Sequence, residues 1–124
     1  MSKVYIAARY DRRFELRFAA NAIRSNGHEV TAQWLDNAEE EKETEAEAAQ
    51  MDVDDVLRAD TVLFIGEPKG SANRGGGRWF ELGLAYAYGK RIFFVPGEGG
   101  SETVFTALPE IASFETVEKA ILEL

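Results

Sequence analysis

The sequence predicts an α/β domain in which helices cover both faces of a five-stranded parallel sheet, forming a three-layer sandwich. Residues 60–95 are the clearest evidence. There an apolar run of strand length is followed by a glycine-rich loop, a helix of small residues and a second apolar run. Such a strand–helix–strand unit requires parallel strands joined by a right-handed crossover. Further apolar runs alternate with helical patterns elsewhere, and 124 residues suit a single domain, residues 1–124.

The first half of the chain is expected to contribute two strands and two helices. The predicted elements are a strand at 3–8, a helix from about 11 to 26, a strand at 29–34 and a helix from about 46 to 58. Asp11 can cap the first helix and Gly27 can end it. Apolar side chains define the inner face of each helix: Leu16, Ala19, Ala20 and Ile23, with Phe14 and Phe18 widening that stripe, and then Ala49, Val53, Val56 and Leu57.

After the strand–helix–strand unit, the chain is expected to end with an edge strand and a closing helix. Residues 103–108 read as a short apolar turn, residues 111–114 as the last strand, and residues 115–124 as a helix with Val117, Ile121 and Leu122 inward. We expect the flavodoxin-like strand order 2-1-3-4-5 rather than a classical dinucleotide-binding order. The loop after the first strand, residues 7–11, lacks the Gly-x-Gly-x-x-Gly pattern, so NAD binding is a weak interpretation.

Composition excludes several classes of site. The chain has no cysteine and one histidine, so we expect no disulfide, no metal site and no cofactor, and we read His28 as structural. We expect no signal peptide and no membrane span, and therefore a cytoplasmic location. The net charge is −8, but residues 36–55 hold ten acidic residues and one lysine, so the rest of the chain carries +1. This balance argues against nucleic-acid binding, and residues 36–47 read as an acidic mobile loop or a frayed helix start.

Glu81 is the first candidate for chemistry. It is expected in the first turn of the helix that follows the glycine-rich loop, where open α/β sheets bind ligands. The structural interpretation is that the helix dipole stabilises an acid there, as in many helix caps. The functional interpretation is that the same dipole keeps the carboxylate ionised, as a nucleophile requires. A carboxylate is the usual nucleophile at an anomeric carbon, where the transition state is cation-like.

Other residues are expected at the same edge of the sheet. Arg74 and Arg78 flank three consecutive glycines, whose backbone N–H groups can approach an anion, although such a loop can also be a plain connector. Asp52 borders the apolar stripe of its helix, where an acid is more often solvated, as we expect for Asp54 and Asp55. Tyr5 and Arg9, at the first strand, would open onto the same crevice, although they could equally be a core tyrosine and a surface base.

Taken together, these segments resemble the nucleoside 2-deoxyribosyltransferase family. The likeness lies in Tyr5-Ile-Ala-Ala, in Asp52 ahead of Ala59-Asp60, and in the run from Arg74 through Glu81-Leu-Gly-x-Ala to Gly89-Lys90. The ending from Glu102 to Phe114 also resembles short members of this family. The likeness covers nearly the whole chain except residues 36–47.

The resemblance implies roles for individual residues. Glu81 would be the nucleophile that forms a covalent 2-deoxyribosyl-enzyme, Asp52 would donate or steer a proton near the leaving base, and Tyr5 would hold the nucleophile. It also implies a homodimer or larger homo-oligomer in which Thr103 reaches a neighbouring site. The expected substrate-binding residues are Ala7, Arg9, Arg74, Gly75, Gly76, Gly77, Arg78 and Thr103.

The resemblance therefore implies an enzyme of nucleotide salvage that cleaves the N-glycosidic bond of a 2′-deoxynucleoside or its 5′-monophosphate and transfers the deoxyribose to another base. Gly75 stands where the transferases carry a second base-contacting aspartate and the hydrolytic relatives a serine, so base and phosphate preference stay open. Arg9, Arg74 and Arg78 favour tolerance of a 5′-phosphate. The alternatives are a hydrolytic deoxynucleoside monophosphate N-glycosidase, a non-catalytic nucleotide-binding module and, third, a flavin-binding electron carrier.

Overall fold

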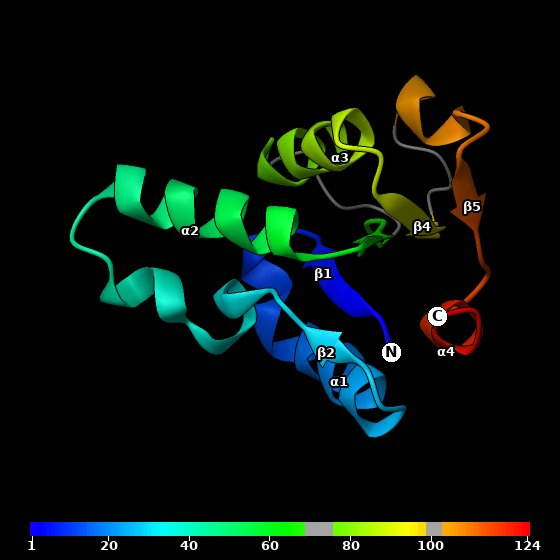
Figure 1. The fold of residues 1–124 in the computed structure, drawn as a ribbon, viewed down its shortest axis with the longest axis horizontal. Helices are drawn as coiled ribbons and strands as arrows, with labels where there is room; N and C mark the ends of the chain where they lie inside the picture. The colour runs from blue at the N-terminus through cyan, green and yellow to red at the C-terminus, as the bar shows by residue number, and fades with distance from the viewer. Residues whose placement is uncertain (69–75, 99–102) are drawn as a thin grey trace.

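The structure is a computed structural model that describes residues 1–68, 76–98 and 103–124. A sheet of five parallel strands lies between α1 and α4 on one face and α2 and α3 on the other, which confirms the three-layer prediction (Figure 1). The strand order is β2-β1-β3-β4-β5, as predicted. The strands are β1 (Lys3–Ala7), β2 (Glu29–Val30), β3 (Thr61–Ile65), β4 (Arg91–Val95) and β5 (Ile111–Ser113); the helices are α1 (Arg13–Ser25), α2 (Glu45–Arg58), α3 (Gly77–Ala87) and α4 (Val117–Leu122). The described residues also include four 3₁₀ helices: η1 (Tyr10–Arg12), η2 (Gln33–Asp36), η3 (Ala38–Glu41) and η4 (Val104–Ala107).

The central strands β1, β3 and β4 are apolar along nearly their whole length because helices cover both faces of the sheet. Their register pairs Ala7 with Phe64, so β1 and β3 end side by side at one edge. At this edge the chain after β3 passes very close to the chain after β4. A Cβ on Gly66 would lie 2.5 Å from the backbone nitrogen of Gly97, and one on Gly97 would lie 1.7 Å from the carbonyl oxygen of Glu67. Only glycine fits at these two crossing points.

The first helix differs from the prediction at its start and at its edge. α1 begins at Arg13, after the 3₁₀ turn η1, and Asp11 does not cap it but pairs with Arg9 at 2.7 Å. Phe14 and Phe18 are exposed rather than inward, at 60% and 52%, and the guanidinium groups of Arg13 and Arg17 lie 4.7 and 4.8 Å from the centre of the Phe14 ring. The predicted buried stripe is confirmed, and Gly27 ends the helix with a φ of +87°.

The predicted strand over 29–34 is wrong beyond Val30. β2 has two residues, and Trp34 lies in η2, where its indole Nε1 donates to the carbonyl oxygen of Ile6 at 3.0 Å. Burying this large ring over the sheet, with its N–H paired, turns the chain away from the edge of the sheet. His28 is structural in the fold, since its Nδ1 accepts a hydrogen bond from the backbone N–H of Ser2 at 2.9 Å.

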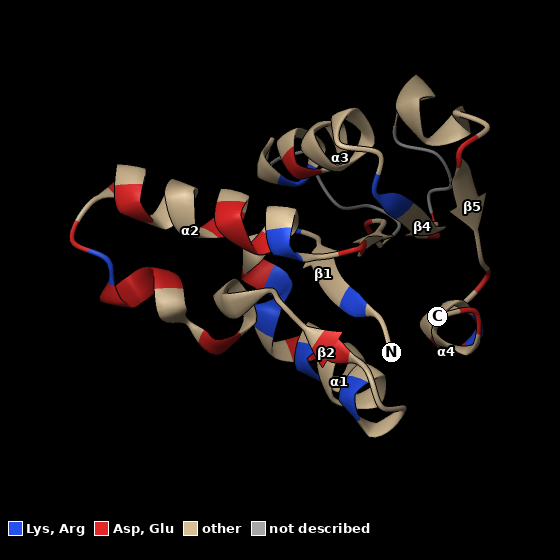
Figure 2. Ribbon diagram, viewed as in Figure 1, with Lys and Arg blue, Asp and Glu red and all other residues tan. Residues whose placement is uncertain are grey.

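The acidic segment 36–47 contains defined structure. It holds η3 and the start of α2, whose cap Thr44 accepts a hydrogen bond from the backbone N–H of Glu47. Acidic side chains gather along η3 and α2 (Figure 2). The expected loop or frayed helix is therefore partly wrong at the level of secondary structure, and the mobility of this segment stays a prediction.

Other predicted faces also need correction. Within α2 the buried side chains are Met51, Asp55 and Val56, whereas Ala49 is exposed. The closing helix is shorter than predicted, and it buries Ala120 while Leu122 is 79% exposed. No helix among the described residues is long and apolar enough to cross a membrane.

Asp55 is the most informative of these corrections, because an expected solvated charge is completely buried. Its carboxylate accepts hydrogen bonds from the Gln33 backbone N–H at 3.0 Å and the Gln33 side-chain amide at 2.8 Å, and it pairs with Arg58 at 2.6 Å. These contacts compensate the cost of removing the charge from water. They also fasten α2 to the segment after β2.

We predict that Asp55→Ala lowers the free energy of unfolding by about 2–3 kcal/mol, because the Gln33 donors lose a charged acceptor. Urea denaturation followed by circular dichroism measures this change. Asp54→Ala on the exposed side of the same helix is the matched control and should cost less than about 0.5 kcal/mol. Equal effects of the two substitutions would contradict a structural role specific to Asp55.

Candidate active site

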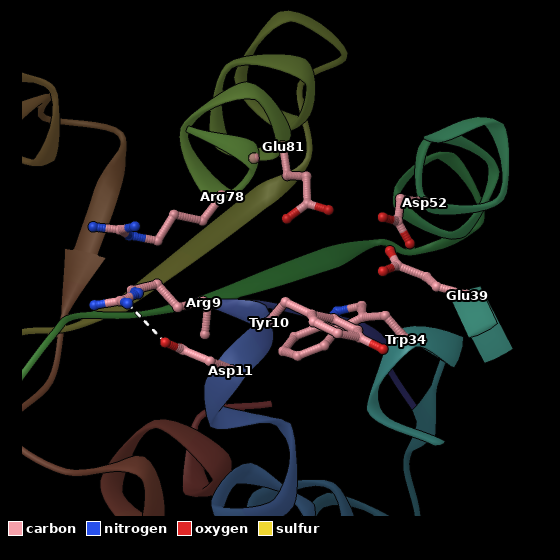
Figure 3. A pocket seen from close by; sticks show the side chains of 10 residues that line it. Arg9, Tyr10, Asp11, Trp34, Glu39, Asp52, Arg78 and Glu81 are labelled. Carbon is pink, nitrogen blue, oxygen red and sulfur yellow. Dashed lines mark hydrogen bonds and ion pairs between the residues drawn. The ribbon is translucent and has the colours of Figure 1, made fainter. Parts of the chain in front are cut away.

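A pocket of about 400 Å³ opens at the edge of the sheet where β1 and β3 end, beneath α2 and α3 (Figure 3). This is the position at which open α/β sheets bind ligands. Side chains from all of the surrounding elements reach it. The lining residues are Ala8, Arg9, Tyr10, Asp11, Trp34, Glu39, Asp52, Gly77, Arg78 and Glu81.

Glu81 projects from α3 into the middle of this pocket (Figure 3). Its carboxyl accepts a hydrogen bond from the hydroxyl of Tyr5, a side chain that rises from β1 and is completely buried. Burial raises the pKa of the Tyr5 phenol well above its ordinary value, and the nearby Glu81 charge raises it further, so Tyr5 stays a donor. The sheet therefore supports the carboxyl from below.

The prediction that the helix dipole keeps Glu81 ionised is wrong. α3 begins at Gly77, so Glu81 is its fifth residue and lies beyond the first turn, where the exposed backbone N–H groups are. Burial raises the pKa of Glu81 to about 8. The Tyr5 hydrogen bond opposes this change, and the charges of Glu39 and Asp55 add to it. Glu81 is therefore poised between its two protonation states near neutral pH.

Asp52 reaches the pocket from α2 (Figure 3). Burial raises the pKa of its carboxyl well above the ordinary range, and a hydrogen bond with Glu39 and the charges of Glu39, Glu81 and Asp55 raise it further. Its Oδ1 atom is buried and accepts no hydrogen bond from any residue that the structure describes. The surroundings of Asp52 therefore favour its protonated form.

The opposite end of the pocket is cationic. The guanidinium groups of Arg9 and Arg78 lie together there, away from Asp52 and Glu39, with Glu81 between the two ends (Figure 3). Arg78 is 2% exposed and its guanidinium lies 5.4 Å from the centre of the Trp79 ring. The pocket therefore changes from positive to acidic along its length.

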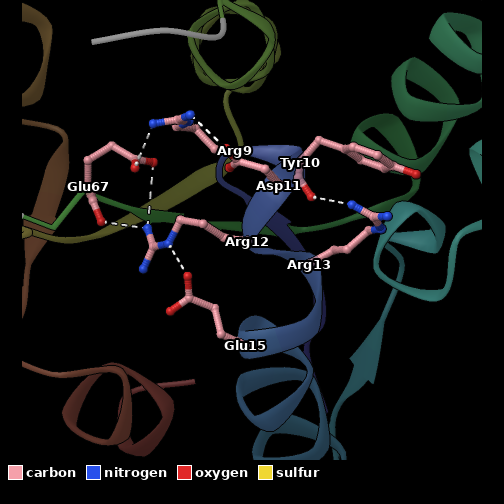
Figure 4. A network of polar contacts seen from close by, with 8 residues as sticks. Arg9, Tyr10, Asp11, Arg12, Arg13, Glu15 and Glu67 are labelled. Carbon is pink, nitrogen blue, oxygen red and sulfur yellow. Dashed lines mark hydrogen bonds and ion pairs between the residues drawn. The ribbon is translucent and has the colours of Figure 1, made fainter. Parts of the chain in front are cut away.

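A network of ion pairs fixes the positive end (Figure 4). Glu67, which is nearly buried just after β3, pairs with Arg9 at 3.5 Å and with Arg12 at 3.6 Å. Arg12 also donates to the carbonyl oxygen of Gly66 and to Glu15, both at 2.8 Å. These contacts hold the chain after β3 against the start of α1, and they position Arg9 at the pocket.

The structure brings together most of the residues that the sequence predicted. Glu81, Asp52, Arg9, Gly77 and Arg78 line one pocket, and Tyr5 contacts Glu81 from beneath. Three others lie apart from the lining: Ala7 is buried within β1, Gly76 precedes α3, and Thr103 caps η4 beside a separate apolar pocket. The predicted ligands Arg74 and Gly75 lie outside the described residues.

Sequence reasoning missed several lining residues. Tyr10 and Trp34 form an aromatic pair with ring centres 6.2 Å apart on the floor of the pocket. Glu39 comes from the acidic segment, for which the sequence predicts a mobile loop or a frayed helix start. One signal was available for Tyr10, because it lies three residues after the end of β1, the strand that ends at the site. No sequence signal separated Glu39 from its acidic neighbours.

Two carboxyl groups of the pocket, those of Glu81 and Asp52, are candidates for chemistry. Among the described residues, no group of three or more histidine, cysteine, aspartate or glutamate side chains could hold a metal ion. Two carboxyls in different environments can divide the roles of nucleophile and proton donor. Glu81, which accepts a hydrogen bond and lies in the middle, suits the first role, and Asp52 suits the second.

Comparisons with known proteins identify a matching family. The sequence profile described as nucleoside 2-deoxyribosyltransferase matches residues 4–107. A search of curated proteins returns no significant match.

Three solved structures are similar across nearly the whole chain. They are a 2-deoxyribosyltransferase from Bacillus psychrosaccharolyticus (20% identity, 97% of this chain and 90% of that chain, TM-score 0.74), a CMP N-glycosidase from Clostridium botulinum (17%, 98% and 95%, TM-score 0.66) and a conserved protein from Enterococcus faecalis V583 (16%, 99% and 96%, TM-score 0.71). At these identities the structural matches establish the fold.

The raised pKa of Glu81 predicts a pH-dependent cost to stability. Between pH 4.5, the ordinary pKa of glutamate, and about 8, the folded protein holds a proton on Glu81 that the unfolded chain releases. Stability from this group therefore falls as pH rises through that range. We expect Glu81→Gln to be more stable than the unsubstituted protein at pH 9 by about 2 kcal/mol or more, since each pKa unit corresponds to about 1.4 kcal/mol.

Thermal unfolding of both proteins at pH 5 and pH 9 measures this difference. The gap between the two melting temperatures should be wide at pH 9 and should nearly close at pH 5, where Glu81 holds its proton in the folded protein. A gap that does not depend on pH would show that Glu81 titrates in the ordinary range.

Proposed function

Because the chain belongs to the nucleoside 2-deoxyribosyltransferase family, we propose that it cleaves the N-glycosidic bond of a 2′-deoxynucleoside or its 5′-monophosphate through a covalent glycosyl–Glu81 intermediate. The family and the structural neighbours support deoxyribosyltransferase or N-glycosidase activity. The observation that carries the more specific proposal is the position of the Glu81 carboxyl. It lies in the pocket, is held by Tyr5, and has the protonated Asp52 beside it.

The proposed reaction places the sugar beneath Glu81 and the base toward Asp52. An oxygen of ionised Glu81 bonds to C1′ while the C1′–N bond breaks, and the bonding electron pair leaves with the base. Asp52 transfers its proton to the base nitrogen that receives this pair. Tyr10 and Trp34 provide an aromatic floor on which a planar base can stack.

A second displacement at C1′ completes the proposed reaction. The acceptor is the nitrogen of another base in transfer, or water in hydrolysis. In either case the acceptor bonds to C1′, the Glu81 ester bond breaks, and the acceptor's proton returns to Asp52. Two displacements at the same carbon give overall retention of configuration.

The cationic end of the pocket favours a 5′-monophosphate as substrate, and this is the second candidate. With the sugar at Glu81 and the base at Asp52, the 5′ position faces Arg9 and Arg78. Guanidinium groups bind phosphate in bidentate fashion, and Arg9 is already positioned by Glu67. A hydrolytic nucleotide N-glycosidase is the activity that this feature supports.

We also propose a homodimer or larger homo-oligomer and a cytoplasmic location. Thr103 lies beside an apolar surface pocket that includes Trp79, Tyr86 and Phe105, apart from the pocket of its own chain. The family resemblance implies that this position reaches a neighbouring site, and an apolar surface next to it suits contact with a second copy. Both statements stay predictions.

The direct test is base release from the four common 2′-deoxynucleosides and their 5′-monophosphates, followed by liquid chromatography. We predict that Glu81→Ala lowers the rate by about 10³-fold or more, as expected when a nucleophile is removed. Asp54→Asn, on the exposed side of α2, is the control and should keep the full rate. The same slow background for the unsubstituted protein and Glu81→Ala would contradict an enzyme, and tight nucleotide binding without turnover would then support the binding module.

We further predict that Arg9→Gln raises KM for deoxynucleoside monophosphates about tenfold or more, because one charged hydrogen-bond pair is worth 1.5–3 kcal/mol, each 1.4 kcal/mol being about tenfold. KM for unphosphorylated nucleosides should change about threefold at most, since they present no anion to Arg9. Arg24→Gln, remote on α1, is the control. An equal rise in KM for both substrate classes would show that Arg9 does not contact phosphate.

A further inference from the structure

Resting on the proposed function, we propose that Glu39 is a positioning residue that holds a proton on Asp52 for delivery to the departing base. Glu39 belongs to η3, in the middle of the acidic segment, and it lines the same pocket as Asp52 and Glu81. Its carboxyl points toward that of Asp52 from the facing wall (Figure 3). The residue would thus act on the reaction through Asp52 rather than on the substrate itself.

The backbone and side chains around η3 determine this orientation. Asn37 adopts the left-handed conformation, with a φ of 63°, and reverses the chain between η2 and η3. Arg13, at the start of α1, donates to the Asn37 side-chain oxygen at 2.6 Å and contacts Glu40 at 3.4 Å. The Tyr10 hydroxyl donates to Glu40 at 3.4 Å. Asn37 and Glu40, on either side of Glu39, are thus held by side chains of η1 and α1, and Glu39 faces the pocket.

Asp52 is surrounded by acidic side chains from three helices. They are Glu39 on η3, Glu81 on α3 and Asp55 on α2, with the neutral Tyr5 hydroxyl on β1. Arg58 already pairs with Asp55, and Arg9 and Arg78 lie at the far end of the pocket. A neighbouring carboxylate that accepts a hydrogen bond from Asp52 stabilises the protonated form of Asp52 and disfavours its anion. Burial is the largest cause of the raised pKa of Asp52, and the hydrogen bond and charge of Glu39 are the next largest.

This arrangement balances the proposed chemistry. As the C1′–N bond breaks, the proton passes from the Asp52 oxygen to the base nitrogen and leaves two facing carboxylates. Their mutual repulsion makes the pair a stronger base. In the second displacement the pair therefore recovers a proton from the attacking water or incoming base. One proton leaves and one returns in each turnover.

The test compares Glu39→Gln with Glu41→Gln, which removes the same charge from an exposed position of the same 3₁₀ helix. Base release is measured from pH 5 to 10 on whichever common deoxynucleoside or monophosphate the unsubstituted protein cleaves fastest. The unsubstituted rate should rise through about 8 as Glu81 ionises. It should fall at higher pH as Asp52 loses its proton.

In Glu39→Gln both limbs should move to lower pH, because Glu39 also raises the pKa of Glu81. The falling limb should move further, by about one pH unit or more, since Asp52 loses both a hydrogen bond and a charge. The profile therefore narrows, and the rate on its alkaline side falls about tenfold. Glu41→Gln should match the unsubstituted protein. A Glu39→Gln profile with the unsubstituted shape and position would overturn the proposal.

A substrate that needs no proton separates this role from a structural one. The base of 7-methyl-2′-deoxyguanosine already carries a positive charge and leaves without protonation. Its release should show no falling limb, and Glu39→Gln should cleave it within about twofold of the unsubstituted rate. A structural defect would slow both substrates alike and would overturn the proposal.

A carbon-13 NMR titration of protein labelled at the aspartate and glutamate carboxyls does not depend on activity. The Asp52 signal of the unsubstituted protein should titrate well above the ordinary range of an aspartate, and Glu39→Gln should move that titration to lower pH. An Asp52 titration that Glu39→Gln leaves unchanged would overturn the proposal. No base release from any of the eight substrates, with the Asp52 titration still shifted by Glu39→Gln, would instead refute the proposed function.

Discussion

The hydrogen bond from Tyr5 to Glu81 is the contact on which the rest of the site depends. Tyr5 belongs to the fully buried central strand, so its hydroxyl is as fixed as the sheet itself, and it holds the carboxyl of α3 in a largely apolar setting. Burial of the Glu81 carboxyl raises its pKa. A solvated glutamate would be ionised at all neutral pH values, but it would be neither oriented nor sensitive to its neighbours.

Much of the fold was predictable because the central strands are continuous apolar runs that can be recognised in the sequence. Apolar runs buried on both faces permit few arrangements, and the glycine-rich connection indicated a parallel crossover. The errors arose where tertiary contacts overrode local pattern. The indole of Trp34 finds its hydrogen-bond acceptor on β1, and β2 ends early. Phe14 stays exposed and contacts the guanidinium groups of two neighbouring arginines. Asp55 can be buried because its carboxylate is paired with Gln33, which is distant in sequence, and with Arg58, one helical turn further along α2.

The candidate site was predictable from two kinds of signal. Arg9 stands just after the first strand, and the family resemblance pointed to Glu81 and Asp52, which lie inside their helices. The ionisation of Glu81 was not predictable, because it depends on where α3 begins, and one turn decides whether backbone N–H groups reach the carboxyl. Glu39 could not be distinguished among ten acids in one segment. A left-handed Asn37 and a bond to Arg13 select it, and neither can be recognised from composition.

The order of charges along the pocket also determines which compounds would block it. An inhibitor with an anionic group at one end, a protonated nitrogen in place of the anomeric carbon and a flat heterocycle at the other end would meet Arg9, Glu81 and the Asp52–Glu39 pair in turn. The reversed order would place the anionic group against the Asp52–Glu39 pair. The affinity of such a compound would rise with pH, because its protonated nitrogen binds Glu81 more tightly once Glu81 is ionised.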